Sequence, residues 1–462
     1  MQRSKLRKWV LMFYARKWLK IVSILTAVVV LLSSTVCVMY LSEFDQSLKD
    51  YWEDFRSMIR PQTEQESDSD LRYGLNEDGT GYIVRGIADR TSYIITGLGE
   101  PTNTDIVIPK DYQGLPVVQI GEGAFDECVH MTTIVIPDSV TIIGNRAFKR
   151  CDSLTSVVIP NSVTKIGDDA FLGCKSLISV TIPGSVQSIG DNAFQKCPAL
   201  EELVMQDGLK TIGAGAFCGC TNLKSVTLPD SVKSIGIGAF QDCTNMTDVI
   251  LSNSLTKLPN DIFQNCTSLT SITVPEGIVK IPSGAFRNCS KLTTVSVPNS
   301  ITYIDDGAFW GCEALIHFTM PEQLTIIGAN AFRDCISLHD VEIPSGVVSM
   351  GNGAFQNCVG LTTVTIPTGV TTIEQFAFSG CTNLISVEIS EGVTSISEDA
   401  FRGCTKLTSI TIPVSVKSIC VGAFSGCSGL NDIYYAGYGR EWDEIQILSN
   451  NIPLKLATLH HR

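Results

Sequence analysis

The sequence predicts an α/β solenoid of about fourteen 23-residue coils with parallel strands and short helical turns, capped at both ends and preceded by one transmembrane helix. Three observations support this prediction. Cysteine recurs every 23 residues, phenylalanine keeps a fixed place in the same repeat, and an uncharged apolar stretch lies near the N-terminus. Length alone, at 462 residues, suggests about three domains, but that estimate assumes no internal repeat.

Composition and charge exclude two broad classes of protein. An apolar fraction of 44% excludes a disordered chain, and a sequence pI of 4.9 excludes a strongly basic nucleic-acid binder. The formal net charge of -13 is unevenly spread. Residues 1–20 hold seven basic residues and no acidic one, which leaves a net charge of -20 on the remainder. The chain therefore begins with a short basic segment, residues 1–20 (the basic head), and the rest of it (the body) is strongly acidic.

Residues 21–41 are an uninterrupted stretch of 21 uncharged and mostly apolar residues. At about 1.5 Å per residue, a helix of this length crosses a hydrocarbon core of about 30 Å. All flanking positive charge precedes the stretch, which indicates a cytoplasmic N-terminus and an exported body. We expect an uncleaved signal anchor, with a cleaved signal peptide as the alternative. Residues 1–20 are then a cytoplasmic head, and the acidic segment 42–71 is a stalk.

The body is one unit repeated in a constant register. Fourteen cysteines run from Cys128 to Cys427 at intervals of 23 residues, and Phe stands three residues before each of them. Alanine precedes that Phe in every copy except at Ile262, and Leu or Met follows three residues after the Cys. Proline stands nine residues after the Cys in ten copies. This regularity predicts a solenoid over residues 121–435.

Each unit contains the pattern of a strand and of a tight turn. Residues 154–159 (LTSVVI) alternate apolar with Ser or Thr and are rich in β-branched residues, which favours a strand. The A-F-x-x-C segment has apolar positions three apart, which predicts one helical turn or a 3₁₀ turn. One unit cannot cover its own apolar side, so copies must stack. Because open ends would expose the core and strand edges, we expect caps at residues 72–120 and 436–462.

The consensus I-P-x-S-V-T-x-I-G-x-x-A-F-x-x-C-x-x-L-T-x-V closely resembles the BspA-type leucine-rich repeat of bacterial and some protozoan surface proteins. The resemblance covers about residues 72–462, including the D-I-V-I-P segment at 105–109 and Y-Y-A-G at 434–437. It implies a leucine-rich repeat solenoid displayed at the cell surface. For some members it implies adhesion to host extracellular proteins or other microbes. It implies no family-wide catalytic residues.

The cysteines invite two interpretations. Seventeen Cys in an exported protein are typical of a disulfide framework, but one Cys per coil in the same core position indicates a stacked ladder of small apolar residues. Coils about 4.8 Å apart would allow a disulfide by distance, whereas parallel side-chain directions disfavour it. We expect buried free thiols, with disulfides or a metal as alternatives. Cys218 and Cys220 form a close pair, a weak metal signal without nearby His.

No catalytic, cofactor or metal motif stands out. The sequence has no glycine-rich phosphate loop, metal-spaced His/Asp set or serine-hydrolase elbow, and the constant register leaves no insertion for a lid. We therefore expect no enzymatic activity and no cofactor. His317 and Asp340 occupy equivalent outward positions one repeat apart, so we expect them to be neighbours. They form either an exposed ion pair or a binding or catalytic pair.

The candidate binding surface is the outward side of the predicted strands. Its residues are mostly Ser, Thr and Val, and they include Thr294, Thr363 and Thr365. Such a broad, weakly charged face suits extended contact with a partner, although Ser and Thr also suit a merely solvated strand. Trp310 interrupts a mainly polar column, and Arg287 and Arg333 lie one repeat away on either side. Either an Arg–Trp–Arg stack or an exposed binding anchor explains it.

These observations predict a single-pass membrane protein with a cytoplasmic N-terminus and an extracellular repeat domain. Its partners would be an extracellular protein, a glycan or another cell surface, with the membrane contacted through residues 21–41 and no nucleic acid bound. The alternative is a structural spacer of the cell envelope that has no discrete ligand.

Overall fold

The computed structural model describes residues 71–75, 81–86, 91–98 and 104–461. The predicted basic head 1–20, the apolar stretch 21–41 and all but the last residue of the stalk 42–71 lie outside these residues. Within the described ranges, no helix combines the length and apolar character needed to span a membrane.

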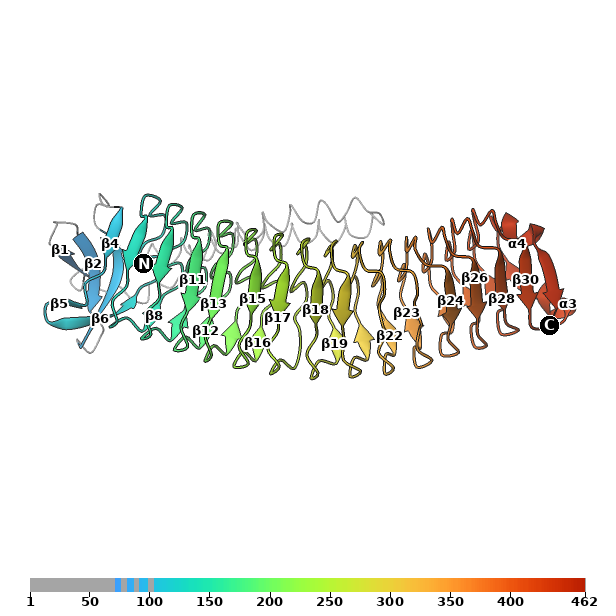
Figure 1. The fold of residues 1–462 in the computed structure, drawn as a ribbon, viewed down its shortest axis with the longest axis horizontal. Coiled ribbons are helices and arrows are strands. Elements are labelled where there is room, and N and C mark those ends of the chain that lie inside the picture. The colour runs from blue at the N-terminus through green and yellow to red at the C-terminus, as the bar shows by residue number, and fades with distance from the viewer. Residues whose placement is uncertain (1–70, 76–80, 87–90, 99–103, 462) are drawn as a thin grey trace, which may run out of the picture. The chain divides into compact units, whose positions relative to one another are not determined.

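The repeat body is a parallel β-solenoid of about sixteen turns, with coils side by side along its length (Figure 1). Its longer strands form the first ladder: β4 (Asp105–Val107), β7 (Thr133–Val135), β9 (Ser156–Val158), β11 (Ser179–Ile182), β13 (Glu202–Met205), β15 (Ser225–Thr227), β17 (Asp248–Ile250), β18 (Ser271–Thr273), β20 (Thr294–Ser296), β24 (Thr363–Ile366), β26 (Ser386–Ile389), β28 (Ser409–Ile412), β30 (Asp432–Tyr435) and β32 (Thr458–His461).

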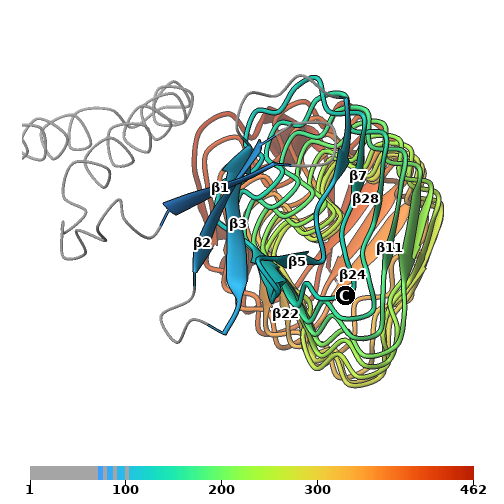
Figure 2. The same ribbon diagram turned by 90° about the vertical axis from the view of Figure 1, so that its left-hand side faces the viewer.

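A second ladder, made mostly of two-residue strands, follows the turn after the first: β6 (Leu115–Ile120), β8 (Ile142–Ile143), β10 (Lys165–Ile166), β12 (Ser188–Ile189), β14 (Thr211–Ile212), β16 (Ser234–Ile235), β19 (Lys280–Ile281), β21 (Tyr303–Ile304), β22 (Ile326–Ile327), β23 (Ser349–Met350), β25 (Thr372–Ile373), β27 (Ser395–Ile396), β29 (Ser418–Ile419) and β31 (Gln446–Ile447). Figure 2, looking along the stack, shows the coils superposed around one interior.

The predicted strand register is confirmed. In β11 and β13, Ser179 pairs with Glu202 and Val180 with Leu203, so residues 23 apart face each other in parallel. Val180 and Ile182 are buried while Thr181 between them is exposed, as the period of a strand requires. The chain therefore buries the same residue types in every coil.

The interior is a continuous stack of Phe rings lined by thiols. Ring centroids of successive Phe residues from Phe125 to Phe424 lie 4.9 to 6.0 Å apart, and the rings are close to parallel. The Cys151 Sγ–H donates to the Phe125 carbonyl oxygen at 3.2 Å, and every later ladder cysteine repeats this bond one coil on. Burial of the ladder is confirmed for all members except half-buried Cys128, and the described cysteines are free thiols.

The predicted helical turns are wrong, and the described residues contain too little helix to show the α/β class. In all fourteen repeats the backbone is left-handed two residues before the Phe and again two residues after it, as at Gly123 (φ 63°) and Glu127 (φ 61°). A left-handed residue ends a right-handed helix, so the A-F-x-x-C segment forms a tight turn. Gly, Asn and Asp, which tolerate this conformation, are frequent at both places. The described α-helices are α3 (Gly439–Asp443) and α4 (Ile452–Leu456), both near the C-terminus.

Both ends of the stack carry additional elements. At the N-terminal end, β1 (Leu71–Leu75), β2 (Gly81–Gly86) and β3 (Tyr93–Leu98) are antiparallel neighbours, and β3 joins β6 in parallel. The short β5 (Asp111–Tyr112) forms a hairpin with β6. At the C-terminal end, β31 and β32 extend the two ladders, and the ring of fully buried Tyr435 packs edge-on against Trp442 at 5.3 Å.

Candidate binding surface

The outward side of the first ladder, hereafter the strand face, is a regular surface of the solenoid. Along β24 the alternation leaves Thr363 and Thr365 exposed and buries Val364 and Ile366. Thr363 pairs with Ser386 and Thr365 with Glu388, so each outward residue has a neighbour one coil away. Toward the N-terminus the same face exposes apolar residues: Val107, Val135, Val158, Val204 and Ile250 are 52% to 78% exposed.

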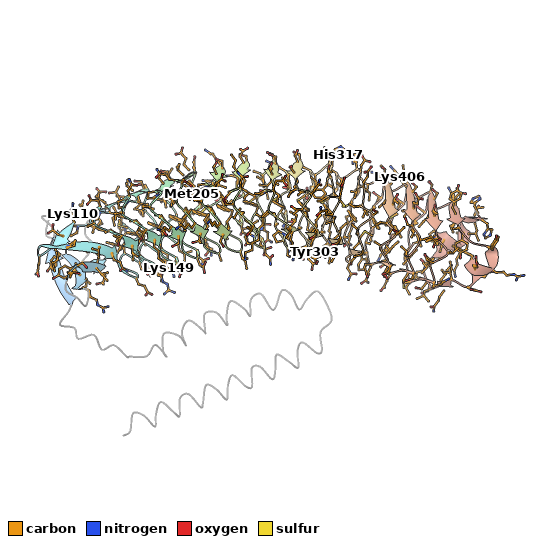
Figure 3. All side chains as sticks on the ribbon, turned by 90° about the horizontal axis from the view of Figure 1, so that it is seen from below. Lys110, Lys149, Met205, Tyr303, His317 and Lys406 are labelled. Atoms are coloured by element: carbon orange, nitrogen blue, oxygen red, sulfur yellow. The ribbon has the colours of Figure 1, made fainter. Side chains whose placement is uncertain are left out.

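Four predicted site residues lie in one column of this face on consecutive coils: Thr294, His317, Asp340 and Thr363. His317 and Asp340 form an isolated parallel bridge, which confirms that they are neighbours. Their Nδ1 and Oδ2 atoms are 3.9 Å apart, and each side chain is 70% exposed. Figure 3 shows His317 at the outer edge of the molecule. An ion pair this long and exposed contributes at most about 1 kcal/mol, which leaves both groups available to a partner.

Trp310 lies elsewhere, on the turn edge that follows Phe309. The predicted Arg–Trp–Arg stack is present. The guanidinium carbons of Arg287 and Arg333 lie 4.0 and 4.8 Å from the centroid of the indole ring. The indole Nε1–H donates to Asp334 Oδ2 at 2.9 Å. These contacts hold the half-buried indole on both faces and at its polar edge. A binding role for Trp310 stays a prediction, and it would be separate from the strand face.

The strand face is hollowed between the coils of His317 and Asp340. A depression of about 670 Å³ opens there, lined by residues 317–320, 322, 340 and 342–345. Between β20 and β24 the first ladder is reduced to the single His317–Asp340 bridge. The repeat pattern of the sequence does not predict this hollow.

One unusually large side chain lies at the hollow. Phe318 stands where the other repeats place Val, Ile or Leu, six residues after the Cys. Its ring lies 5.0 Å from those of Phe309 and Phe332, at steep angles to both, while these two stay stacked at 5.2 Å. A phenyl group in a space that holds a branched aliphatic residue in the other repeats overpacks the core, and overpacking generally displaces side chains and backbone. We attribute the lost strand pairing to this overpacking.

The lining of the hollow combines an apolar floor with acidic walls. Phe318 and Met320 are 4% and 7% exposed, and Ile343 is half-buried although its equivalent Ile366 is buried. The walls carry Glu322, Asp340 and Glu342, and no Lys or Arg is among the lining residues. Apart from the contact of Asp340 with His317, none of these carboxylates has an ion-pair partner among the described residues.

The thiols of the core do not form a reactive site. Burial raises the pKa of Cys220, Cys289 and Cys381 to about 12, so these thiols stay protonated near neutral pH. Half-buried Cys218 also has a raised pKa, caused by burial and by the nearby Asp242 carboxylate. Among the residues that the structure describes, no group of three or more His, Cys, Asp or Glu is placed to hold a metal ion.

The chain forms a parallel β-solenoid in which nearly every coil carries a Leu at the same position, and these two features define the class of leucine-rich repeat proteins. The model of the BspA-type leucine-rich repeat region, which spans six copies, matches residues 118–220, 187–316 and 308–431. The chain therefore belongs to the BspA-type leucine-rich repeat family.

Solved structures of bacterial proteins show the same likeness. A leucine-rich repeat protein from Bacteroides ovatus is 26% identical, with a TM-score of 0.61 over 86% of this chain and 100% of its own. A leucine-rich cell-surface protein from Faecalibacterium prausnitzii is 28% identical, with a TM-score of 0.49 over 81% and 97% of the two chains. The pneumococcal vaccine antigen PcpA is 18% identical, with a TM-score of 0.47 over 85% and 98%. No curated protein matches the chain.

Membership of this family limits the functions to consider. Leucine-rich repeat proteins generally bind other proteins, and their solenoid is typical of non-enzymatic binding proteins.

Proposed function

We propose that this chain is a single-pass membrane protein that displays its solenoid outside the cell and binds an extracellular protein through the strand face. The observation that carries the binding proposal is the regular outward display of Ser, Thr and Val by the first ladder. Such a surface offers many weak contacts in fixed register, which suits an extended partner. The seven basic residues before the apolar stretch 21–41 support the membrane anchor and its orientation.

The binding test uses the full chain and a panel of matrix proteins, glycans and intact cells, with saturable binding as the readout. Thr294→Arg and Thr363→Arg place a long cationic side chain on the strand face, and we expect each to weaken binding about tenfold or more. The matched control is Thr211→Arg, which changes an exposed Thr of the second ladder. Equal effects of all three substitutions would contradict the assignment to the strand face. Absence of any saturable partner would favour the structural spacer.

The membrane orientation has its own test. An epitope placed after Arg462 is expected to be accessible to antibody on intact cells, whereas one placed before Arg3 requires permeabilisation. The reverse pattern would contradict the proposed orientation. Release of the chain into the medium would favour the cleaved signal peptide.

A further inference from the structure

We infer that the hollow between the His317 and Asp340 coils receives a lysine or arginine side chain of the protein partner. This inference rests on the proposed function and specifies the chemistry of the partner at one point of the strand face. It is drawn from three features of the hollow: its place at an interruption of the sheet, its apolar floor and its acidic walls.

The first feature is the interruption of the sheet. Elsewhere on the strand face paired strands present short side chains in a regular array, as with Thr363 and Ser386. Around Phe318 the pairing is reduced to one bridge, and a depression of about 670 Å³ replaces the flat surface. A side chain that projects from a partner can enter only where the surface is hollowed.

The second feature is the floor. Phe318, Met320 and half-buried Ile343 present carbon to the interior of the hollow. The methylene stem of Lys or Arg buries well against such a surface while its charged head stays near polar groups. A bare metal ion would gain nothing from this floor.

The third feature is the charge of the walls. Glu322 comes from the first coil, and Asp340 and Glu342 come from the next. The lining contains no Lys or Arg, and its one imidazole, that of His317, lies beside Asp340. Charge complementarity therefore selects a cation, and a guanidinium can bond to a carboxylate through two N–H groups. The net charge of -20 after residue 20 adds long-range attraction for a basic partner.

The test follows the Met320 methyl signal by NMR in the full chain labelled with [methyl-13C]methionine and held in detergent micelles. Met320→Leu assigns this signal among those of the nine methionines. Acetyl-arginine amide is the probe, and acetyl-glutamine amide and calcium chloride are the comparison solutes. We expect a saturable shift in the millimolar range with the arginine probe and none with the other two.

Variants then assign the shift to the acidic walls. Glu322→Gln combined with Glu342→Gln is expected to weaken the arginine probe about tenfold. Glu276→Gln is the matched control, because Glu276 is exposed and holds the place of Glu322 in an earlier repeat, outside the hollow. It is expected to leave the affinity unchanged.

Three results would overturn the inference: no saturable shift with the arginine probe, an equal shift in the double variant, or an equal shift with calcium chloride or the glutamine probe. Capture of a partner, and its loss in Thr294→Arg, is measured separately. If partner capture succeeds while the arginine probe fails, the inference is wrong and the proposed function stands. If the arginine probe binds as expected and no partner is captured, the proposed function is wrong while the hollow still binds a cationic side chain.

Discussion

The regular coils over residues 121–236 and the central coils over residues 255–345 share one core but differ in their ladders. In the regular coils the second ladder runs unbroken from β6 to β16, and β4 to β13 form one five-stranded sheet. Between the two regions the second ladder stops after β16, and it resumes at β19. In the central coils the first ladder consists of the β18–β20 pair and a single bridge. The stacked Phe rings and the thiol bonds nevertheless continue through both regions. The core therefore holds the register, and the ladders are secondary to it.

Single residues account for the broken second ladder. In the regular coils the N–H of Gly167 donates to the Ile143 carbonyl at 2.8 Å, and neighbouring coils repeat this bond. The equivalent positions in the central coils hold Pro259 and Pro282, which have no N–H to donate. The ladder breaks at the coils where the donor is missing.

The Phe stack is also looser in this region. Ile262 replaces the alanine that precedes the Phe in every other repeat. The centroid of the Phe263 ring lies 5.9 and 6.0 Å from the centroids of the two neighbouring Phe rings. The corresponding distances are both 4.9 Å for Phe171. The larger Ile262 side chain is fully buried and occupies space that separates the coils.

Alkaline pH is expected to produce the largest effect, because it acts on the core that both regions share. The thiols of Cys220, Cys289 and Cys381 ordinarily have a pKa near 9, and burial raises it to about 12. Between these values the unfolded chain loses its thiol protons while the folded chain keeps them. The thiols therefore leave the free energy of unfolding undiminished below about pH 9, and they lower it as the pH rises toward 12.

Urea midpoints measured from pH 8 to pH 11 check this expectation. Cys289→Ser and Cys381→Ser serve as controls, because the hydroxyl does not titrate in this range, and each is expected to flatten the decline. An identical pH profile in the variants and the parent would contradict the assignment to the thiols.

Truncation of a stacked ring compares the two regions directly. Phe171→Ala in the regular stack is expected to lower the free energy of unfolding by about 3–5 kcal/mol, the usual cost of a large core cavity. Phe263→Ala is expected to cost about 1 kcal/mol less, because its ring contacts are already more distant. Urea denaturation of both variants measures the difference. A larger loss at Phe263 would show that the central stack is not the looser one.

Exchange of proline between the C-terminal coils, where the second ladder is intact, and the central coils tests the cause of the broken ladder. The Ser397 N–H donates to the Ile373 carbonyl at 2.9 Å, so Ser397→Pro is expected to cost about 1–3 kcal/mol. The reciprocal change, Pro282→Ser, supplies the missing donor, and we expect its new amide to be protected in hydrogen exchange. An unprotected amide at residue 282 would mean that the neighbouring coils, rather than proline, keep the ladder open.

The smallest effect is expected at the stack of Arg287, Trp310 and Arg333, which spans three central coils. Trp310→Ala removes two cation–π contacts and the bond to Asp334, and we expect a loss of about 1–2 kcal/mol. Partner binding is expected to stay unchanged, because Trp310 lies off the strand face. Lost binding with unchanged stability would identify it as a binding anchor.

The repeat register was predictable because its signal is local and repeated. The spacing of Phe and Cys alone places residues 23 apart in contact, and this suffices to predict the His317–Asp340 neighbours and the stack around Trp310. The tight turn was also within reach. Gly, Asn and Asp recur directly before the Cys, where they mark a left-handed residue that a helix cannot contain.

The hollow was not predictable in the same way. Phe318 departs visibly from its column, but whether a large residue is absorbed or disrupts the sheet depends on its packing against Phe309 and Phe332 from two coils. Such packing is a property of the assembled stack. The same holds for the acidic walls, because Glu322 and Glu342 converge only after neighbouring coils align.

Recognition by the strand face is tested most directly by a hydrogen-exchange footprint of the full chain with its captured partner. Binding is expected to slow exchange in residues 294–297, 317–320, 340–343 and 363–366, while the second-ladder amides of β12 and β14 remain unchanged. Protection confined to the second ladder or to the turn edge around Trp310 would contradict the account.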